Sequence, residues 1–194
     1  MKLILASASP RRREILTTLG VAFTVVTADA DETCDLSDPG ARVEAISVKK
    51  CHAVADALAA EGKLDADTVI LASDTLVTLD GAFLGKPRDE ADARRMIQTL
   101  QGRTHVVASG LAICRDGRTV TAHELTRVTF APMNDYEIEA YLATGECFGK
   151  AGGYAIQGFA ARFITGIDGD YFNVVGLPVH RLYETLKAEL GIVL

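Results

Sequence analysis

The stretch LILASASPRRREIL, residues 3–16, contains the step from strand to helix that decides the fold. Leu3 to Ala6 is a short apolar run, which is typical of a buried strand. Ser9 is favourable just before a helix, and Pro10 suits the first helical position. The apolar residues that follow have helical spacing, and Gly20 ends the pattern. The stretch therefore predicts a strand–helix unit of the kind that builds α/β proteins.

Predicted strands and helices continue to alternate along the remaining chain, with hairpins inserted. The sequence predicts strands at Val21–Val26, Thr68–Ser73, His105–Cys114 and Thr119–Phe130, helices at about Ala41–Ala60, before Gly102, after Asn134 and at about His180–Leu190, and turns at Asp80-Gly81 and Asp116-Gly117. This order predicts an α/β fold in which a mixed twisted sheet is flanked by helices. The length predicts a single domain, residues 1–194.

The composition excludes several classes of protein. Apolar residues make up 48% and charged residues 24% of the 194 residues, so disorder is excluded as the main state. No apolar run approaches the roughly 18 residues of a membrane span. The first residues lack the shape of a secretory signal, so we expect a cytoplasmic protein without membrane partners. The net charge of -6 and the twelve aromatic residues disfavour a nucleic-acid-binding module.

The four cysteines form no motif in the sequence. Cys34, Cys51, Cys114 and Cys147 are too far apart for a CxxC pair, so zinc and redox motifs are not indicated. Reduced thiols are the expectation for a cytosolic protein.

Three arginines open the first predicted helix, where the helix dipole disfavours positive charge. Arg11, Arg12 and Arg13 occupy its first turn, and a cation there costs about 0.3–1 kcal/mol. An anion bound at the helix start, where backbone N–H groups are free, removes the conflict. Alternatively, the arginines extend into solvent or meet the acidic loop at Asp29–Asp38. The hydroxyls of the Ser-x-Ser-Pro lead-in favour a phosphate site.

Lys50 falls within the apolar stripe of the second predicted helix. At about 100° per residue it lies roughly 40° from Ile46, whereas Lys49 falls outside the stripe. A buried ammonium requires a partner. The alternative is a lysine whose charged end extends past the stripe to water.

Asp74 follows a predicted buried strand, at the position where open α/β sheets place ligands. The alternative is an Asp that begins the hairpin at Leu76–Leu84. The Gly85-Lys86-Pro87 loop offers a further cation after this hairpin, although it is not a Walker A loop.

The segment Gly145–Gly158 is rich in glycine, which lets backbone N–H groups approach a ligand closely. It is equally consistent with a set of turns. Lys150 and Gln157 are its side chains suited to recognition, and the Gln157 amide offers a base both a donor and an acceptor.

Together these segments resemble the Maf family of nucleoside triphosphate pyrophosphatases. The resemblance spans nearly the whole chain and rests on LILASASPRRREIL at 3–16, Asp31-Glu32, Lys50, SDT at 73–75, LGKP at 84–87, GRTHVV at 102–107, GKAGGYAIQG at 149–158 and GDYFNVVGLP ending at Pro178. It implies two lobes around a central cleft, hydrolysis of a nucleoside triphosphate to monophosphate and diphosphate, a divalent cation (Mg²⁺ or Mn²⁺) and, in many members, a homodimer. House-cleaning of non-standard nucleotides is a further implication.

The resemblance also implies roles for single residues. It makes Asp74 the general base and a metal ligand, places Glu32 near the metal, and assigns phosphate contacts to Arg12, Lys50 and Lys86. Ser7, Ser9 and Lys150 are further candidate substrate-binding residues. Arg11, Thr75 and Gln157 match the branch that acts on dTTP and UTP, rather than the 7-methyl-GTP branch. One position departs from the family pattern, because Gly149 replaces the usual Asp before Lys150. A rival interpretation is a non-catalytic nucleotide sensor involved in cell division.

Overall fold

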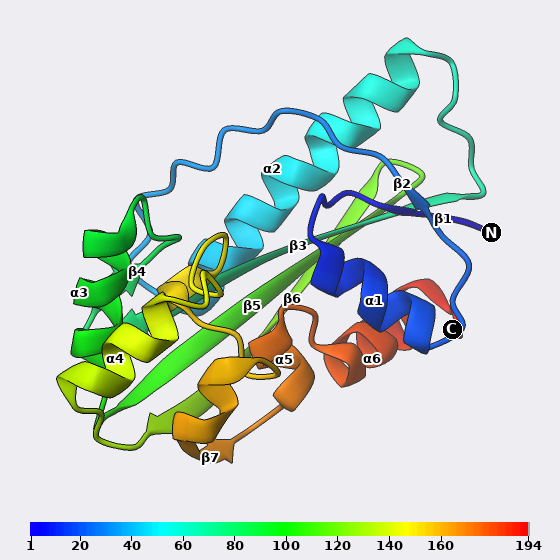
Figure 1. Cartoon of the computed structure of the whole chain (residues 1–194). Helices are drawn as coiled ribbons and strands as arrows, with labels where there is room; N and C mark the ends of the chain where they lie inside the picture. Colours follow the sequence, from blue (N-terminus) through cyan, green and yellow to red (C-terminus); the bar gives the residue numbers. More distant parts are fainter. Residues whose placement is uncertain (194) are drawn as a thin grey trace. The chain divides into compact units, whose positions relative to one another are not determined.

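The computed structural model describes residues 1–193 and alternates strands with helices as the sequence predicts (Figure 1). In chain order its elements are β1 (Lys2–Leu5), α1 (Pro10–Thr18), β2 (Thr24–Val25), α2 (Pro39–Ala60), β3 (Thr68–Leu79), β4 (Ala82–Leu84), α3 (Glu90–Leu100), β5 (Thr104–Arg115), β6 (Arg118–Phe130), α4 (Asp135–Leu142), the 3-10 turns η1 (Ala151–Gly153) and η2 (Phe159–Phe163), β7 (Ile164–Asp168), α5 (Tyr171–Val175) and α6 (Val179–Leu190).

Within residues 1–193 the strands form one seven-stranded sheet in the order β2-β1-β3-β5-β6-β7, with β4 paired to β3. β1 runs parallel to both β2 and β3, whereas β4 is antiparallel to β3 and β7 is antiparallel to β6. The mixed sheet and the α/β class are therefore confirmed.

The described chain divides into two compact units. Unit 1 contains Met1–Asp74, Ser109–Glu124 and the residues from Gly176 onward, and unit 2 contains Thr75–Ala108 and Leu125–Val175. The long strands β3, β5 and β6 each contribute residues to both units. The division falls within β3, between Asp74 and Thr75.

The core of unit 1 lies between α2 and the sheet. Cys51, Val54 and Leu58 of α2 pack with residues of β1, β3 and β5. A Cβ atom added to Gly110 on β5 would lie 2.5 Å from the backbone of Val43 on α2, so glycine permits this close approach. The helix begins after Asp38, whose Oδ1 accepts a hydrogen bond from the backbone N–H of Ala41 at 2.7 Å.

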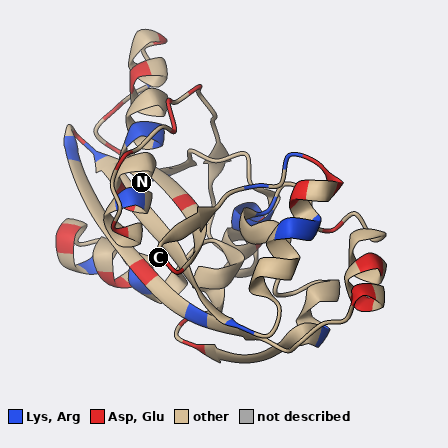
Figure 2. Cartoon of the chain, turned by 90° about the vertical axis from the view of Figure 1, so that its left-hand side faces the viewer, with Lys and Arg blue, Asp and Glu red and all other residues tan. Residues whose placement is uncertain are grey.

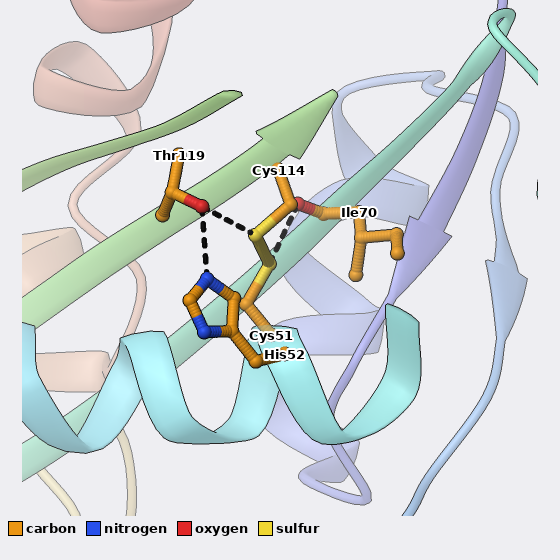
Figure 3. Close-up of a disulfide and its surroundings, with 5 residues drawn as sticks. All are labelled: Cys51, His52, Ile70, Cys114 and Thr119. Atoms are coloured by element: carbon orange, nitrogen blue, oxygen red, sulfur yellow. Dashed lines mark hydrogen bonds between the residues drawn. A yellow bond between two sulfur atoms is a disulfide. The ribbon is translucent and has the colours of Figure 1, made fainter. Parts of the chain in front are cut away.

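Two of the cysteines form a disulfide within this core, so the expectation of four reduced thiols is wrong. Cys51 of α2 is bonded to Cys114 of β5, with their Cα atoms 6.5 Å apart (Figure 3). The hydroxyl of Thr119 lies beside the Cys114 sulfur at 3.4 Å and beside His52 Nε2 at 2.9 Å. No local pattern indicates the pair, because 63 positions separate its members.

In unit 2 the predicted hairpin and helices are confirmed. β3 and β4 pair around Asp80-Gly81, with Leu79 opposite Ala82. The predicted inner side of α3 is buried, namely Met96, Ile97 and Leu100. At the start of α4, Asn134 and Glu137 form the predicted capping box.

Two predicted strand boundaries are wrong. β3 does not end at Asp74 but continues to Leu79, because Val77–Leu79 remain paired in the hairpin with β4. Asp74 therefore lies within a strand, not at its carboxyl end. β2 is shorter than the predicted Val21–Val26, since the strand covers Thr24–Val25.

Acidic and basic residues are interspersed along the chain (Figure 2), in keeping with its small net charge of -6. None of the helices in residues 1–193 is both long and apolar enough to cross a membrane.

Candidate active site

Asp74 faces α2 because of its position within β3. Side chains alternate between the two faces of a strand, and Ala72 packs into the core under α2. Asp74, two residues later, points to the same face, where its Oδ1 accepts a hydrogen bond from Lys50 Nζ at 2.7 Å. Ser73 points to the opposite face, and its hydroxyl donates to the carbonyl oxygen of Gly176 at 3.2 Å.

Lys50 joins two carboxylates from distant parts of the sequence. Its Nζ lies 2.7 Å from Asp74 and 3.1 Å from Oε1 of Glu32. The side chains of Lys50 and Asp74 are only 17% and 15% exposed, whereas Glu32 is 55% exposed. Lys50 is therefore a largely buried, paired ammonium, and the alternative of a lysine that extends past the stripe to water is excluded.

Arg12 is buried and held in a fixed orientation. Its Nε donates to the Gly176 carbonyl oxygen at 2.8 Å, and Nη1 donates to Ser7 Oγ at 2.9 Å. Burial lowers the pKa of Arg12 to about 10, while the nearby Asp74 and Glu32 carboxylates act to raise that pKa. The guanidinium thus remains protonated at neutral pH and lies within the electrostatic field of both acids.

The start of α1 differs in detail from the prediction. Ser9 occupies the N-cap position, but its side chain makes no capping hydrogen bond. Ser7 Oγ instead accepts from the Ser9 backbone N–H at 3.2 Å. The first turn contains no acidic residue. Arg11 is half-buried, which lowers its pKa, and Arg13 is exposed. The turn thus combines helix-end N–H groups with arginines, an arrangement suited to an anion.

In unit 2 the loop of Lys86 is held on both sides by hydrogen bonds of its own backbone groups. The Gly85 carbonyl oxygen accepts from the Gly152 N–H at 3.0 Å. The Arg88 backbone N–H donates to the side-chain Oδ2 of Asp92 at 3.2 Å. Lys86 itself is exposed. The structure thus ties this loop to the glycine-rich segment within unit 2.

The glycine-rich segment presents Lys150 and Gln157 in different ways. Lys150 Nζ donates to the backbone carbonyl oxygens of Glu146 and Phe148, so main-chain oxygens hold the lysine beside Gly149, where the resemblance predicts an Asp. Gln157 is exposed. The segment consists of turns and the short η1, as the interpretation of the segment as a set of turns predicts.

The two carboxylates paired with Lys50 are oxygen donors of the type that Mg²⁺ takes. Glu32 and Asp74 each place a carboxylate oxygen within 3.1 Å of the Lys50 ammonium. Mg²⁺ binds one or two carboxylates together with substrate phosphates, rather than a closed protein cage. Among the described residues there is no cluster of three or more His, Cys, Asp or Glu side chains that could hold a metal ion.

Ser73 and Gly176 anchor the site, a role that the sequence motifs did not indicate. Both the Arg12 guanidinium and the Ser73 hydroxyl bind the carbonyl oxygen of Gly176. Gly176 has a φ of 124°, a conformation that favours glycine. Two features of the sequence could have indicated this role. Ser73 directly precedes Asp74, and Gly176 lies within the GDYFNVVGLP stretch.

Comparison with known proteins places the chain among curated relatives over nearly its full length. A dTTP/UTP pyrophosphatase of Caldanaerobacter subterraneus subsp. tengcongensis is 42% identical, with 99% of this chain and 91% of the relative covered. A dTTP/UTP pyrophosphatase of Bacillus cytotoxicus is 44% identical, with 96% and 94% covered. Among solved structures, the Staphylococcus aureus Ham1 protein is similar over 68% of this chain and 72% of its own, at 15% identity and a TM-score of 0.47.

The profile of the family described as Maf-like protein matches residues 2–189. This match and the identity of more than 40% to full-length relatives agree with the resemblance that the sequence motifs indicated. The chain belongs to the Maf family.

Proposed function

We propose that this protein hydrolyses dTTP and UTP to the monophosphate and diphosphate, and that modified pyrimidine nucleotides are substrates of the same kind. The single observation that carries the proposal is the Lys50–Asp74 pair at 2.7 Å, with Glu32 on the same ammonium and the buried Arg12 nearby. The relatives that are 42–44% identical over 96% or more of the chain are named dTTP/UTP pyrophosphatases.

The positive groups of unit 1 bind the polyphosphate. Arg12 and Lys50 supply fixed cations, and the start of α1 supplies N–H donors near Ser7 and Ser9. Charge that develops on phosphoryl oxygens is best stabilised by preorganised groups of this kind. Because Arg12 is anchored on a backbone carbonyl, it pays little ordering entropy when substrate binds.

Asp74 activates the attacking water. Its carboxylate orients the water and accepts its proton as the oxygen attacks the α-phosphorus, and diphosphate leaves with the bridging oxygen. Lys50 keeps the carboxylate aimed through the 2.7 Å contact. A divalent cation (Mg²⁺ or Mn²⁺), held by Glu32 and Asp74, would supply charge neutralisation on the phosphate oxygens.

Base choice is assigned to Arg11, Thr75 and Gln157. These three types match the dTTP/UTP branch, and the Gln157 amide can hydrogen-bond a pyrimidine edge through donor and acceptor together. Lys86 and Lys150 are further substrate-contacting residues in this proposal.

A diphosphate-release assay across a panel of nucleoside triphosphates, with Mg²⁺ or Mn²⁺, tests the proposal. The expected result is release from dTTP and UTP in preference to the purine nucleotides. Preference for 7-methyl-GTP would contradict the proposed substrates and assign the protein to the 7-methyl-GTP branch of the family. Tight nucleotide binding without release would identify a non-catalytic sensor and would contradict the enzymatic role of Asp74.

A further inference from the structure

The glycine-rich segment of unit 2 is fixed on the amino-terminal side of Gln157. Three hydrogen bonds hold it: Gly152 N–H to the Gly85 carbonyl oxygen at 3.0 Å, the Tyr141 hydroxyl to the Gly153 carbonyl oxygen at 2.9 Å, and the Tyr154 hydroxyl with His105 Nε2 at 2.7 Å. Tyr141 and His105 are almost fully buried, at 0% and 1% exposure. The backbone that leads to Gln157 therefore starts from a rigid base.

Glu146 fixes the chain on the other side of Gln157. Its Oε2 accepts from the Phe159 N–H at 2.7 Å, and its Oε1 accepts from the Ala160 N–H at 3.3 Å. The carboxylate also lies against Gly158, where an added Cβ atom would come within 2.1 Å of Oε2. One carboxylate thus holds Phe159 and Ala160 by hydrogen bonds and lies against Gly158, directly after Gln157.

Gln157 is the exposed residue between these two anchored parts. Ile156, just before it, is buried at 6% exposure, whereas Gln157 is exposed. The direction of the amide depends on the backbone from Ile156 to Gly158, and Glu146 holds one end of that backbone.

We propose that Glu146 is a positioning residue for base selection, acting through Gln157. This inference rests on the proposed pyrimidine triphosphate substrate. The two N–H groups need two acceptors, and a carboxylate provides both. A glutamine would place an NH₂ group against one of the N–H donors, so the charge is required and not only the shape.

Glu137 offers a matched control in the same unit. Its Oε2 accepts a backbone N–H, that of Asn134, at 2.8 Å, and it closes the capping box of α4 rather than the Gln157 segment. Glu146→Gln and Glu137→Gln therefore make the same chemical change to the same kind of interaction.

The test measures kcat and KM for dTTP and GTP in the wild type, Glu146→Gln, Glu137→Gln and Gln157→Ala, and in the double variant of residues 146 and 157. In Glu146→Gln, the ratio of kcat/KM for dTTP over GTP falls about tenfold, the effect of losing one well-placed hydrogen bond. The loss appears in KM for dTTP and leaves the GTP constants unchanged. Glu137→Gln leaves the ratio within about twofold.

The double variant separates positioning from general loosening. If Glu146 acts through Gln157, Glu146→Gln adds nothing further to the ratio once Gln157 is Ala. A folded Glu146→Gln protein with the wild-type ratio, or an additive double variant, would overturn the inference while leaving the proposed function intact. Absence of base preference in the wild type would instead count against the proposed function.

Amide hydrogen exchange gives a second readout that does not need activity. The amides of Phe159 and Ala160 exchange faster in Glu146→Gln and at the wild-type rate in Glu137→Gln. Unchanged exchange at both amides would remove Glu146 as the anchor. If Glu146→Gln does not fold, Glu146→Asp keeps the charge while shortening the reach, and the same comparisons apply.

Discussion

Lys50 Nζ lies 2.7 Å from Oδ1 of Asp74, and both side chains are at least four-fifths buried. The pair connects α2 to the point where β3 passes from unit 1 to unit 2. A buried ion pair is weak support for stability, because desolvation offsets much of the attraction. In the proposed function the pair is a preorganised charge arrangement that substrate phosphates enter.

Replacing Lys50 by Gln removes the common partner of two carboxylates. We expect kcat/KM for dTTP to fall roughly tenfold to a hundredfold, since a hydrogen bond to a charged group contributes about 1.5–3 kcal/mol. Lys49→Gln is the control, because the neighbouring Lys49 pairs with the exposed Asp31 at 3.3 Å. An exposed pair contributes little, so this variant should keep near wild-type constants. Equal losses in the two variants would mean that Lys50 has no special role.

Gln157→Glu tests base recognition. The new carboxylate lacks the donor that the amide presents to a pyrimidine, so dTTP and UTP should lose kcat/KM by about tenfold more than other triphosphates. Gln98→Glu on α3 adds the same charge to an exposed position of unit 2. Steady-state kinetics over the nucleotide panel measure the difference. An equal loss for every base would show that the charge alone, and not pairing with the base, is responsible.

His105 makes stability depend on pH. Burial lowers the pKa of His105 from 6.5 to about 4, and its Nδ1 has no hydrogen-bond partner among the described residues. The unfolded chain therefore binds a proton that the folded chain does not between those pH values. The contribution of neutral His105 to the free energy of unfolding is complete above pH 6.5. It is lost as the pH falls towards 4, by about 3 kcal/mol at most.

Urea unfolding of the wild type and of His105→Phe, at several pH values from 7 to 4, checks this prediction. The variant should lose less stability over that range than the wild type. If the stability of the two proteins had the same pH dependence, proton uptake by His105 on unfolding would not be the cause, and the prediction would be wrong.

Much of the fold could be predicted because local patterns agree with the tertiary structure. The Ser9-Pro10 start of α1, the Asp80-Gly81 turn and the Asn134–Glu137 capping box each depend on neighbouring residues. The Cys51–Cys114 pair could not be predicted, because it depends on how α2 packs on β5. The continuation of β3 past Asp74 was also missed, since hairpin pairing there overrides the local signal for an end.

The candidate site was predictable where a residue broke a local rule. Lys50 stood inside an apolar stripe and Arg12 at a positive helix end, and both prove to be partnered within unit 1. Ser73 and Gly176 break no such rule, because a small polar residue and a glycine are ordinary in any chain. Their role depends on a contact across 103 positions, which no local pattern contains.

The most direct test concerns Asp74 itself, by comparing nucleotide binding and diphosphate release in Asp74→Asn. The amide preserves the size of the side chain but cannot take the proton of water. We predict dTTP binding, measured by calorimetry, within a few-fold of wild type, and diphosphate release at least about a hundredfold slower. Release at close to the wild-type rate would contradict the account and remove Asp74 from the chemical step.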